Sequence, residues 1–316
     1  MNKIPFFSVI IPLYNKADYI SECLKSALNQ NFEDYEIVIV NDGSTDKSVS
    51  IVESFSSDKI NLFHQKNAGA SAARNNGAQF ANANYIVFLD ADDIWKTNHL
   101  SCIKESIDLY PNAGLFANNY HIKHSSNHIL PAKINIKTGA KQPFILNDFF
   151  KASLNDTAVW TSAAAIEKSK FLKYGMFNPI YLSSQDLDLW IRIALKEPIV
   201  FNPKITMIYD KSIDGSLGKF EDNDARFILF NSFLKHEKDN VYLKKYLDLK
   251  RYGLALRTKI NGETKIHKDT LKTIDFSNLN FKQKTLLKTP SFILKSLNKI
   301  RPFIIKNKIY LSLFKS

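Results

Sequence analysis

Residues 85–93 read YIVFLDADD, in which five apolar residues lead directly into Asp90, Asp92 and Asp93. An apolar run of this length, rich in β-branched and aromatic residues, is typical of a strand that is buried on both faces. The carboxylates that follow the run would lie at the carboxyl end of that strand. This stretch therefore predicts both a buried sheet and an acidic edge to it.

Similar apolar runs occur earlier in the chain, at 7–11, 35–40 and 60–63, and Pro12 is expected to end the first of them. Helical periodicity separates the runs, over 18–29, after the cap residues 44–46, and over 69–81, and it continues over 97–110. Strands that alternate with helices of this length predict βαβ units. We therefore expect an α/β fold with a Rossmann-like, mostly parallel sheet flanked by helices.

Ligands of such sheets bind outside the carboxyl ends of the strands. In this chain, three strand ends are followed by polar or aromatic residues, which are Pro12 to Asn15, Asn41 with Asp42, and Asp90 to Asp93. The sequence therefore predicts a ligand site that these three segments share.

The second half of the chain is less regular. Residues 114–120 predict a further strand, whereas 121–145 lack periodicity and are expected to form a loop. We divide the chain into a first domain at 1–218, which has two halves at 1–120 and 121–218. A helical, Lys-rich region follows at 219–316.

Positive charge is concentrated at the end of the chain. The formal net charge is +12, yet residues 241–316 hold 18 Lys or Arg against 4 Asp or Glu. The last part, 281–316, mixes these lysines with large apolar residues, a composition that suits the surface of an anionic membrane. The alternative is a pair of helices that pack on the rest of the protein and expose their lysines.

Cellular location follows from what the sequence lacks. Cys23 and Cys102 are too few for a disulfide framework, which suits a reducing compartment. No signal-peptide pattern opens the chain, and no apolar run approaches the ~20 residues that span a bilayer. We expect a cytoplasmic protein, or one that is peripheral on the inner face of the plasma membrane.

Asp90-Ala91-Asp92 suits a hard divalent cation, which would neutralise a diphosphate. The alternative is a solvated acidic turn that caps the next helix.

Asp42 could accept hydrogen bonds from a ribose or a base, or it could form an Asx-turn or a helix cap. Neither G-x-G-x-x-G nor G-x-x-x-x-G-K-[ST] occurs, which disfavours dinucleotide oxidoreductases and P-loop NTPases.

Four segments taken together resemble the signature series of family-2 glycosyltransferases. They are 8–15 (SVIIPLYN), 40–46 (VNDGSTD), 67–75 (NAGASAARN) and 88–93 (FLDADD), and their order and spacing agree with the family. The resemblance is strong over 6–120 and weaker over 155–218. It implies a glycosyltransferase A-type fold, in which 1–218 would be the catalytic domain, with a nucleotide-sugar-binding half at 1–120 and an acceptor-binding half at 121–218.

The resemblance also implies roles for single residues. Pro12, Tyr14 and Asn15 would line the nucleotide pocket, with Tyr14 near the base. Asp42 would recognise the base or ribose, and Arg74 and Ala91 would lie on the nucleotide side. Asp90 would face the ribose and the metal, and Asp92 would hold the Mn²⁺ or Mg²⁺ that bridges the diphosphate. The role of Asp93 is left open.

Residues 185–192 (QDLDLWIR) resemble a later block of the family, in which a Glu-Asp pair supplies the general base. This match implies that Asp186 is the base. Gln185 stands where the family usually has Glu, which points to changed acceptor contacts or a changed pKa of Asp186. The residues alone leave two alternatives, because Asp186 could cap a helix and Asp188 could be the base.

Further along, Asp210 and Asp214 stand near positions where the family often has Arg and His. Trp160 and Trp190 could stack on a sugar, although packing in the core is the more common role of tryptophan. His121, His124 and His128 are close in sequence but lack the companion ligands of a zinc site.

The resemblance as a whole implies an inverting, metal-dependent glycosyltransferase. Its donor would be a nucleotide sugar, here a UDP-sugar, and its acceptor a hydroxyl in bacterial-type surface polysaccharide or lipid-linked glycan synthesis. No nucleic-acid partner is expected. Two alternatives stay open, namely a sugar nucleotidyltransferase and a degenerate, non-catalytic protein that binds glycan or nucleic acid through its basic tail.

Overall fold

The computed structural model of the chain describes residues 4–125, 128–136, 139–213 and 222–306, with side chains described to residue 298. The chain separates into two compact units. The sheet unit comprises Met1–Phe149 and Thr157–Phe220, and the helical unit comprises Phe150–Asp156 and Glu221–Ser316. We describe each unit by itself.

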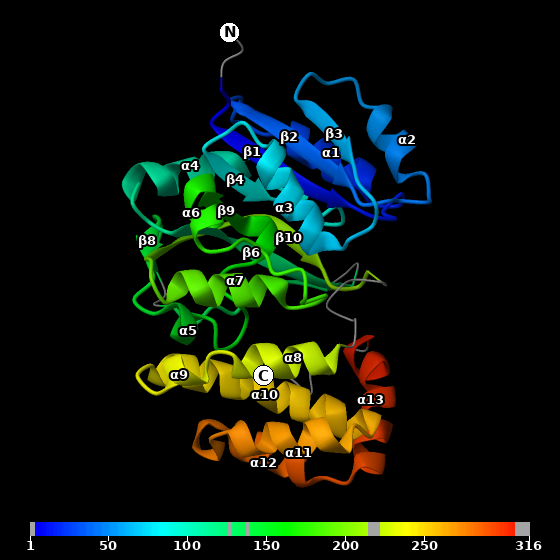
Figure 1. Cartoon of the computed structure of the whole chain (residues 1–316), viewed down its shortest axis with the longest axis vertical. Helices are drawn as coiled ribbons and strands as arrows, with labels where there is room; N and C mark the ends of the chain where they lie inside the picture. Colours follow the sequence, from blue (N-terminus) through cyan, green and yellow to red (C-terminus); the bar gives the residue numbers. More distant parts are fainter. Residues whose placement is uncertain (1–3, 126–127, 137–138, 214–221, 307–316) are drawn as a thin grey trace. The chain divides into compact units, whose positions relative to one another are not determined.

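The sheet unit is built on one sheet, which has ten strands among the described residues (Figure 1). Its order is β3-β2-β1-β4-β9-β6-β10-β5, with β7 paired to β6 and β8 paired to β10. The strands are β1 (Phe7–Leu13), β2 (Tyr35–Asn41), β3 (Ile60–His64), β4 (Tyr85–Phe88), β5 (Ile94–Trp95), β6 (Leu115–Ser125), β7 (His128–Pro131), β8 (Phe144–Ile145), β9 (Ala164–Glu167) and β10 (Ile199–Asp210).

The prediction of a mostly parallel sheet is confirmed. Strand β1 lies parallel to β2 and β4, β2 lies parallel to β3, and β6 lies parallel to β10. Strand β9 is antiparallel to both of its neighbours, β4 and β6, and so joins the two parallel parts. The carboxyl ends of β1, β2 and β4 therefore open at one edge, as the sequence led us to expect.

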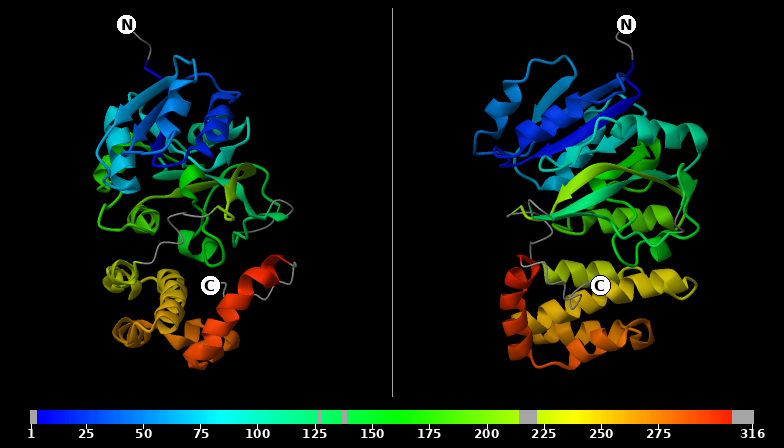
Figure 2. Two further views of the ribbon diagram at one scale, coloured as in Figure 1. Left: turned by 90° about the vertical axis from the view of Figure 1, so that its right-hand side faces the viewer. Right: turned by 180° about the vertical axis from the view of Figure 1, so that it is seen from behind.

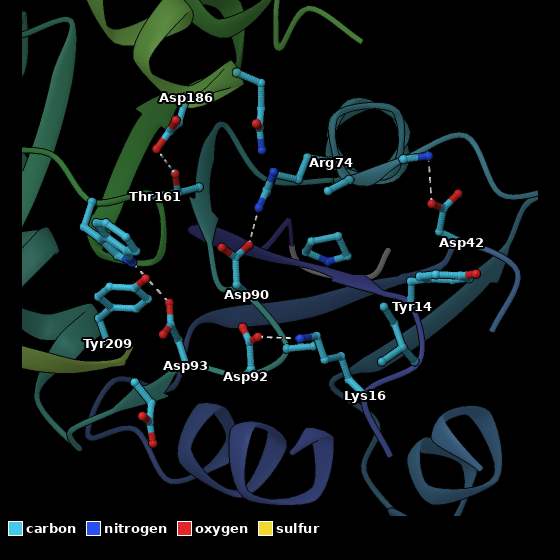
Figure 3. A pocket seen from close by; sticks show the side chains of 18 of the residues that line it. Tyr14, Lys16, Asp42, Arg74, Asp90, Asp92, Asp93, Thr161, Asp186 and Tyr209 are labelled. Atoms are coloured by element: carbon cyan, nitrogen blue, oxygen red, sulfur yellow. Dashed lines mark hydrogen bonds and ion pairs between the residues drawn. The ribbon is translucent and has the colours of Figure 1, made fainter. Parts of the chain in front are cut away.

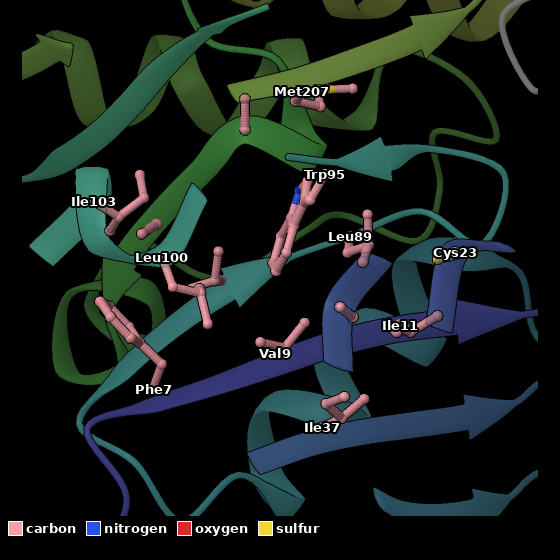
Figure 4. Close-up of a cluster of buried hydrophobic side chains, with 14 of the residues drawn as sticks. Phe7, Val9, Ile11, Cys23, Ile37, Leu89, Trp95, Leu100, Ile103 and Met207 are labelled. Atoms are coloured by element: carbon pink, nitrogen blue, oxygen red, sulfur yellow. The ribbon is translucent and has the colours of Figure 1, made fainter. Parts of the chain in front are cut away.

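Helices cover both faces of this sheet (Figure 1). Side chains of β1 alternate, so that Phe7, Val9 and Ile11 belong to the main core together with Leu24 of α1 and Leu100 of α4 (Figure 4). The helices of the unit are α1 (Ile20–Leu28), α2 (Ser48–Glu53), α3 (Ala70–Phe80), α4 (His99–Leu109), α6 (Lys168–Lys173) and α7 (Gln185–Ala194), with the 3₁₀ turn η1 (Thr161–Ala163).

On the other face, α3 packs very closely on β1 and β2. A Cβ atom placed on Gly77 would lie 2.5 Å from Cγ2 of Ile10, so only glycine fits there without a shift. An aromatic cluster of Phe88, Phe171, Phe177 and Trp190 brings α6 and α7 onto the sheet beside α3. This contact holds the first turn of α7 near the carboxyl end of β4.

Two expectations about the strands are wrong. Pro12 lies inside β1 rather than ending it, at a point where β1 has β2 as a partner but its register with β4 has ended at Ile10. Proline is tolerated where a strand has a partner on one side only. The region 121–145 is not all loop, because β6 continues to Ser125 and β7 and β8 follow.

The helical unit is held by its own apolar core. Leu249 and Tyr252 of the long helix α10 pack with Leu286 and Leu287 of α12 and with Leu294 of α13. In the right panel of Figure 2, α13 lies across one end of the other helices of this unit. The helices are α8 (Asn223–Asn231), α9 (Leu234–Glu237), α10 (Val241–Asn261), α11 (Thr264–Thr273), α12 (Phe281–Lys288) and α13 (Ser291–Lys306), with the 3₁₀ turn η3 (Phe276–Asn278), and α5 (Phe149–Ala152) lies at the unit boundary.

The basic tail has both buried and exposed apolar residues. Over the described residues, no helix combines the length and the apolarity needed to cross a bilayer. Part of the tail packs inside its unit, since Leu286, Leu287 and Leu294 are buried. Phe281 and Phe292 are 84% and 68% exposed. The side chains of 299–316 lie outside the described residues.

Candidate active site

A cavity of about 430 Å³ opens at the carboxyl ends of β1, β2 and β4 (Figure 3). It brings together nearly all of the site residues expected from the sequence, namely Pro12, Tyr14, Asp42, Arg74, Asp90, Ala91, Asp92 and Asp186. It is also lined by residues with no assigned role in the sequence analysis, among them Lys16, Thr161 and Tyr209. The cavity lies wholly within the sheet unit.

Asn15 is the one expected residue that is not part of the lining. Its backbone has φ of 49°, and its Oδ1 accepts a hydrogen bond of 2.8 Å from the backbone N–H of Thr45. Its own N–H donates to Oγ of Ser44. Asn15 therefore ties the loop after β1 to the loop after β2, and its neighbour Tyr14, 47% exposed, is the one that faces the cavity.

Asp42 directly follows β2 and is buried. Its carboxylate accepts hydrogen bonds from Nε2 of Gln65 at 2.7 Å and from the backbone N–H groups of Ala68 and Gly69 at 2.8 and 2.9 Å. These bonds fix the loop that enters α3. The cap-like alternative for Asp42 thus has direct support, although the carboxylate also lines the cavity.

Arg74 on α3 is buried, and one of its nitrogens, Nη2, donates to Oδ1 of Asp90. Its guanidinium also lies 5.3 Å from the ring centre of Phe177. The other two nitrogens, Nε and Nη1, are buried without a hydrogen-bond partner among the described residues. Buried donors of this kind are rare in folded proteins, and each calls for a specific explanation.

Asp92 is bound by a second cation of the chain. Nζ of Lys16 lies 2.6 Å from Oδ2 of Asp92, and both side chains are 19% exposed. The two carboxylates predicted to hold a metal, Asp90 and Asp92, are therefore each ion-paired with a basic residue that lines the same cavity.

Asp93 lies deeper, below an aromatic stack. It accepts a hydrogen bond of 3.2 Å from Nε1 of Trp160, and the ring centre of Trp160 lies 4.0 Å from that of Tyr209 (Figure 3). Burial, with the charges of Asp92 and Asp90, raises the pKa of Asp93 well above its usual value. Trp160 belongs to the cavity wall, whereas Trp190 is buried in the core.

Asp186 is the second residue of α7 and lies in its first turn. Its Oδ2 accepts a hydrogen bond of 3.4 Å from Oγ1 of Thr161, and its Oδ1 accepts one of 2.8 Å from the backbone N–H of Leu187. Burial raises the pKa of the Asp186 carboxyl, and the nearby charge of Asp90 adds to this, whereas the charge of Arg74 opposes it. A carboxyl with a raised pKa is suited to take a proton near neutral pH.

Asp188, the other candidate base, faces a different partner. It is buried, and its Oδ2 lies 2.7 Å from Nη2 of Arg192 on the same helix. It is absent from the cavity lining. Gln185 does line the cavity and is 6% exposed, and its Oε1 has no partner among the described residues. Its neutral amide places no second charge beside Asp186.

Asp210 also lines the cavity, and it forms an ion pair of 2.7 Å with Nζ of Lys123. This contact lowers the pKa of Asp210, as do hydrogen bonds from Ser212, although burial opposes them. Asp214, named with it in the sequence analysis, lies outside the described residues.

A metal is implied by the family resemblance, and the donor set can be tested for fit. Within the described ranges, no group of three or more His, Cys, Asp or Glu side chains could hold a metal ion. Asp90 and Asp92 supply carboxylate oxygens at one strand end, which is the ligand type that Mn²⁺ and Mg²⁺ prefer. Two carboxylates suit an ion that takes its remaining ligands from phosphate and water.

Lys16, Thr161 and Tyr209 are among the cavity residues that sequence reasoning did not place. Lys16 directly follows the Tyr14-Asn15 pair at a strand end, and that position was a usable signal. Trp160 and Tyr209 come from segments far from the acidic residues in the chain. No local pattern connects them to Asp93.

Comparison with known proteins gives the same assignment. The model of the family described as glycosyl transferase family 2 matches residues 8–175. An uncharacterized glycosyltransferase of Rickettsia felis is 31% identical over 238 residues, which is 74% of this chain but 38% of that protein. Glycosyltransferase GlyG of Streptococcus pneumoniae is 28% identical over 180 residues, or 56% of this chain and 60% of GlyG. The chain thus spans less than two thirds of the length of these relatives.

Among solved structures, S. aureus TarS 1–349 in complex with UDP-GlcNAc superimposes with a TM-score of 0.68 at 18% identity. The match covers 97% of this chain and 93% of that one. At this identity the likeness shows the fold, an α/β architecture of the glycosyltransferase A type with a helical region after it. With a family model that matches more than half of its length, the chain belongs to glycosyl transferase family 2.

Proposed function

We propose that this protein transfers a sugar from a UDP-sugar to an acceptor hydroxyl, with inversion at the anomeric carbon. One observation carries the proposal, namely that Asp186 shares a single cavity with Asp90 and Asp92 (Figure 3). A direct displacement needs a base for the incoming alcohol on one side of the sugar and positive charge for the leaving diphosphate on the other. This cavity holds both kinds of group.

The donor is argued from the cavity and from the structural relative. A volume of about 430 Å³ falls within the range of small-molecule sites. TarS, which has the same fold, was solved with UDP-GlcNAc. Tyr14, exposed at one end of the cavity, offers a ring for the base to stack on, and the unpartnered N–H groups of Arg74 offer donors for the nucleotide.

In the transfer step, the Asp186 carboxylate takes the proton of the acceptor hydroxyl as its oxygen attacks the anomeric carbon. The bond from that carbon to the diphosphate oxygen breaks, and the nucleoside diphosphate leaves with the electron pair. Thr161 and the N–H of Leu187 hold the carboxylate in place. Help from a general base of this kind contributes about 10²–10⁴-fold to the rate.

Asp90 and Asp92 would hold Mn²⁺ or Mg²⁺, which when bound supplies positive charge to the leaving diphosphate. Arg74 stays paired with Asp90 and keeps that carboxylate oriented. Trp160 and Tyr209 form a partly exposed pair of rings, inclined by 34° to one another, to which we assign the acceptor sugar ring.

A panel of nucleotides tests the donor. With Mn²⁺ present, we expect UDP and one or more UDP-sugars to raise the thermal unfolding midpoint, because a ligand that binds only the folded state stabilises it. ADP-, GDP- and CMP-linked compounds serve as controls. If no UDP compound raises the midpoint, or if the controls act equally, the donor assignment is wrong.

We further propose that the acceptor belongs to surface polysaccharide or lipid-linked glycan synthesis, and that the helical unit binds the inner face of the plasma membrane. Phe281 and Phe292 are exposed large apolar residues. They stand among Lys282, Lys288 and Lys295, which are exposed as well. Exposed aromatic residues among lysines are suited to an anionic lipid surface.

Vesicle flotation tests the membrane proposal with the whole chain. A Phe281→Ser/Phe292→Ser variant should float less with phosphatidylglycerol vesicles than the wild type, because it lacks the apolar contacts. The matched control is Ile228→Ser/Val241→Ser, which removes two apolar residues of the same unit that are 58% and 76% exposed. Equal flotation of the two double variants would remove the membrane role from this surface.

A further inference from the structure

We infer that Lys16 binds the diphosphate of the donor, and that in the donor-free protein its ammonium group occupies the cation position at Asp92. This inference rests on the proposed function, since it assumes a nucleoside diphosphate in the cavity. It concerns a residue with no assigned role in the sequence analysis, in a contact between side chains 76 positions apart.

The position of Lys16 is fixed by its backbone and not by its side chain. Its N–H donates a hydrogen bond of 2.8 Å to Oγ of Ser48, which anchors the loop after β1 to the start of α2. The side chain then extends along the cavity wall to Asp92 (Figure 3). A lysine carries its charge on a flexible four-carbon stem, so the ammonium can change partner while the backbone stays in place.

The acidic groups beside Lys16 are held in different ways. Asp90 is paired with Arg74, and its N–H donates to Oγ of Ser162, whereas Asp93 is bonded to Trp160. The contact of Asp92 is the ion pair with Lys16, in which Nζ lies 2.6 Å from Oδ2. Asp92 is thus the carboxylate whose partner is both cationic and able to move.

An ammonium group and a divalent cation that lie against the same carboxylate oxygen repel each other, so each weakens the binding of the other. In the donor-free protein, Lys16 therefore competes with Mn²⁺ for Asp92. The donor changes this balance, because its diphosphate brings several negative charges into the same cavity. Lys16 can then leave Asp92 for a phosphate oxygen, a charge-assisted contact that replaces the one it gave up.

Replacement of Lys16 should accordingly act in opposite directions on two affinities. Lys16→Met removes the competitor, so the affinity for Mn²⁺ alone should rise by about tenfold, the effect of one charged partner. The same variant loses a phosphate contact, so the affinity for UDP should fall by about tenfold, both with saturating Mn²⁺ and in EDTA. A residue that merely supported the fold would move both affinities down.

Binding is measured without turnover. Free Mn²⁺ is followed by electron paramagnetic resonance in a titration of the nucleotide-free protein, and UDP by calorimetry. Lys25→Met is the matched control, because Lys25 pairs with Glu22 on the surface of α1 and is 61% exposed. It should leave both affinities at the wild-type value. Lys16→Arg keeps the charge and should retain most of the UDP affinity.

The inference is overturned if Lys16→Met binds Mn²⁺ no more tightly than the wild type, or if its UDP affinity equals that of Lys25→Met. These results leave the proposed function intact, provided that the wild type binds UDP. If the wild type binds no UDP with or without Mn²⁺, the proposed function fails and this inference fails with it.

Discussion

Two buried arginines, one in each unit, differ in how many of their N–H groups have a hydrogen-bond acceptor. Arg251 of α10 is fully buried, and each of its five N–H groups has an acceptor. Its nitrogens donate to Asn231, Glu237, Asp248 and the backbone carbonyl of Phe230. Arg74 is 2% exposed, yet only Nη2 is bonded, and Nε and Nη1 have no partner among the described residues.

The difference separates residues that serve the fold from residues that await a ligand. A buried donor without a partner costs about 1–3 kcal/mol, so folding alone gives no reason to leave two on Arg74. Arg251 shows that this chain can satisfy a buried guanidinium completely. The open donors of Arg74 therefore point to a group that arrives later, which the proposed function identifies as the nucleotide.

The largest expected effect concerns the cavity itself. Asp186→Asn should lower kcat by about 10²–10⁴-fold, because an amide cannot take the acceptor proton. UDP affinity should stay at the wild-type value. Stability should not suffer, since burial raises the pKa of Asp186 and makes its ionised form unfavourable in the folded protein. Steady-state kinetics measures kcat, and urea unfolding measures stability. Wild-type turnover in the variant would refute the assignment of the base.

The opposite pattern is expected in the helical unit. Arg251→Met takes one of two cations away from the buried Glu237 and Asp248 and leaves Lys244 as the other, which should cost about 3–5 kcal/mol in the free energy of unfolding. Denaturant unfolding measures it, with Lys272→Met on the exposed face of α11 as the control. UDP affinity of the folded variant should be unchanged. If Arg251→Met is as stable as the wild type but binds UDP weakly, Arg251 serves ligand binding and not the fold.

Arg74→Lys should produce a smaller change, and in binding rather than in stability. Lysine keeps the positive charge beside Asp90 but lacks the planar set of donors. We expect UDP affinity to fall by about tenfold, the value of one hydrogen bond to a charged group, while the unfolding midpoint shifts little. Calorimetric titration with UDP checks this. If unfolding is affected strongly and UDP affinity is not, Arg74 is a fold residue like Arg251.

The smallest effects are those of pH. Because the pKa of Asp186 is raised, kcat/KM should fall on the acid side at a pH above the usual Asp value of about 3.9. In the same window the folded protein holds a proton that the unfolded chain releases. The stabilisation from Asp186 is therefore full below the unfolded pKa and is lost as pH rises through the folded one.

Asp186→Asn should remove that slope from the pH dependence of the unfolding free energy. Paired unfolding curves for wild type and variant, measured across the acid range, report the difference directly. Identical slopes would show that burial does not shift this carboxyl.

Much of the cavity could be predicted because the apolar runs mark the strands, and the parallel order of the strands then brings their carboxyl ends to one edge. The run 85–93 and the runs before it place Asp42, Asp90 and Asp92 at neighbouring strand ends once the sheet is known to be parallel. The second part of β6, at 121–125, was missed although Asn119 to Lys123 alternate polar and apolar residues, and the alternation matches the burial of β6. The polar side chains of His121, Lys123 and His124 made this part of the chain look like a loop, although its residues alternate as in a strand.

Contacts between distant parts of the chain could not be predicted. Lys16 meets Asp92, and Trp160 meets Asp93, only after α1 and the sheet have brought their segments together. The second contact also explains why the role of Asp93 stayed open in the sequence. Asn15 shows the converse, because its place in the motif suggested a ligand contact and its side chain instead ties the loop after β1 to the loop after β2.

The short segment Phe150–Asp156 affects the choice of fragments for expression. It belongs to the helical unit, where Phe150 lies 5.9 Å from the ring of Tyr246 and Leu154 packs against the apolar core. An expression fragment that stops near residue 218 would retain these apolar side chains and discard Tyr246 and the apolar core against which they pack. Such a fragment is expected to aggregate, so soluble material should be sought from clones that keep both units together.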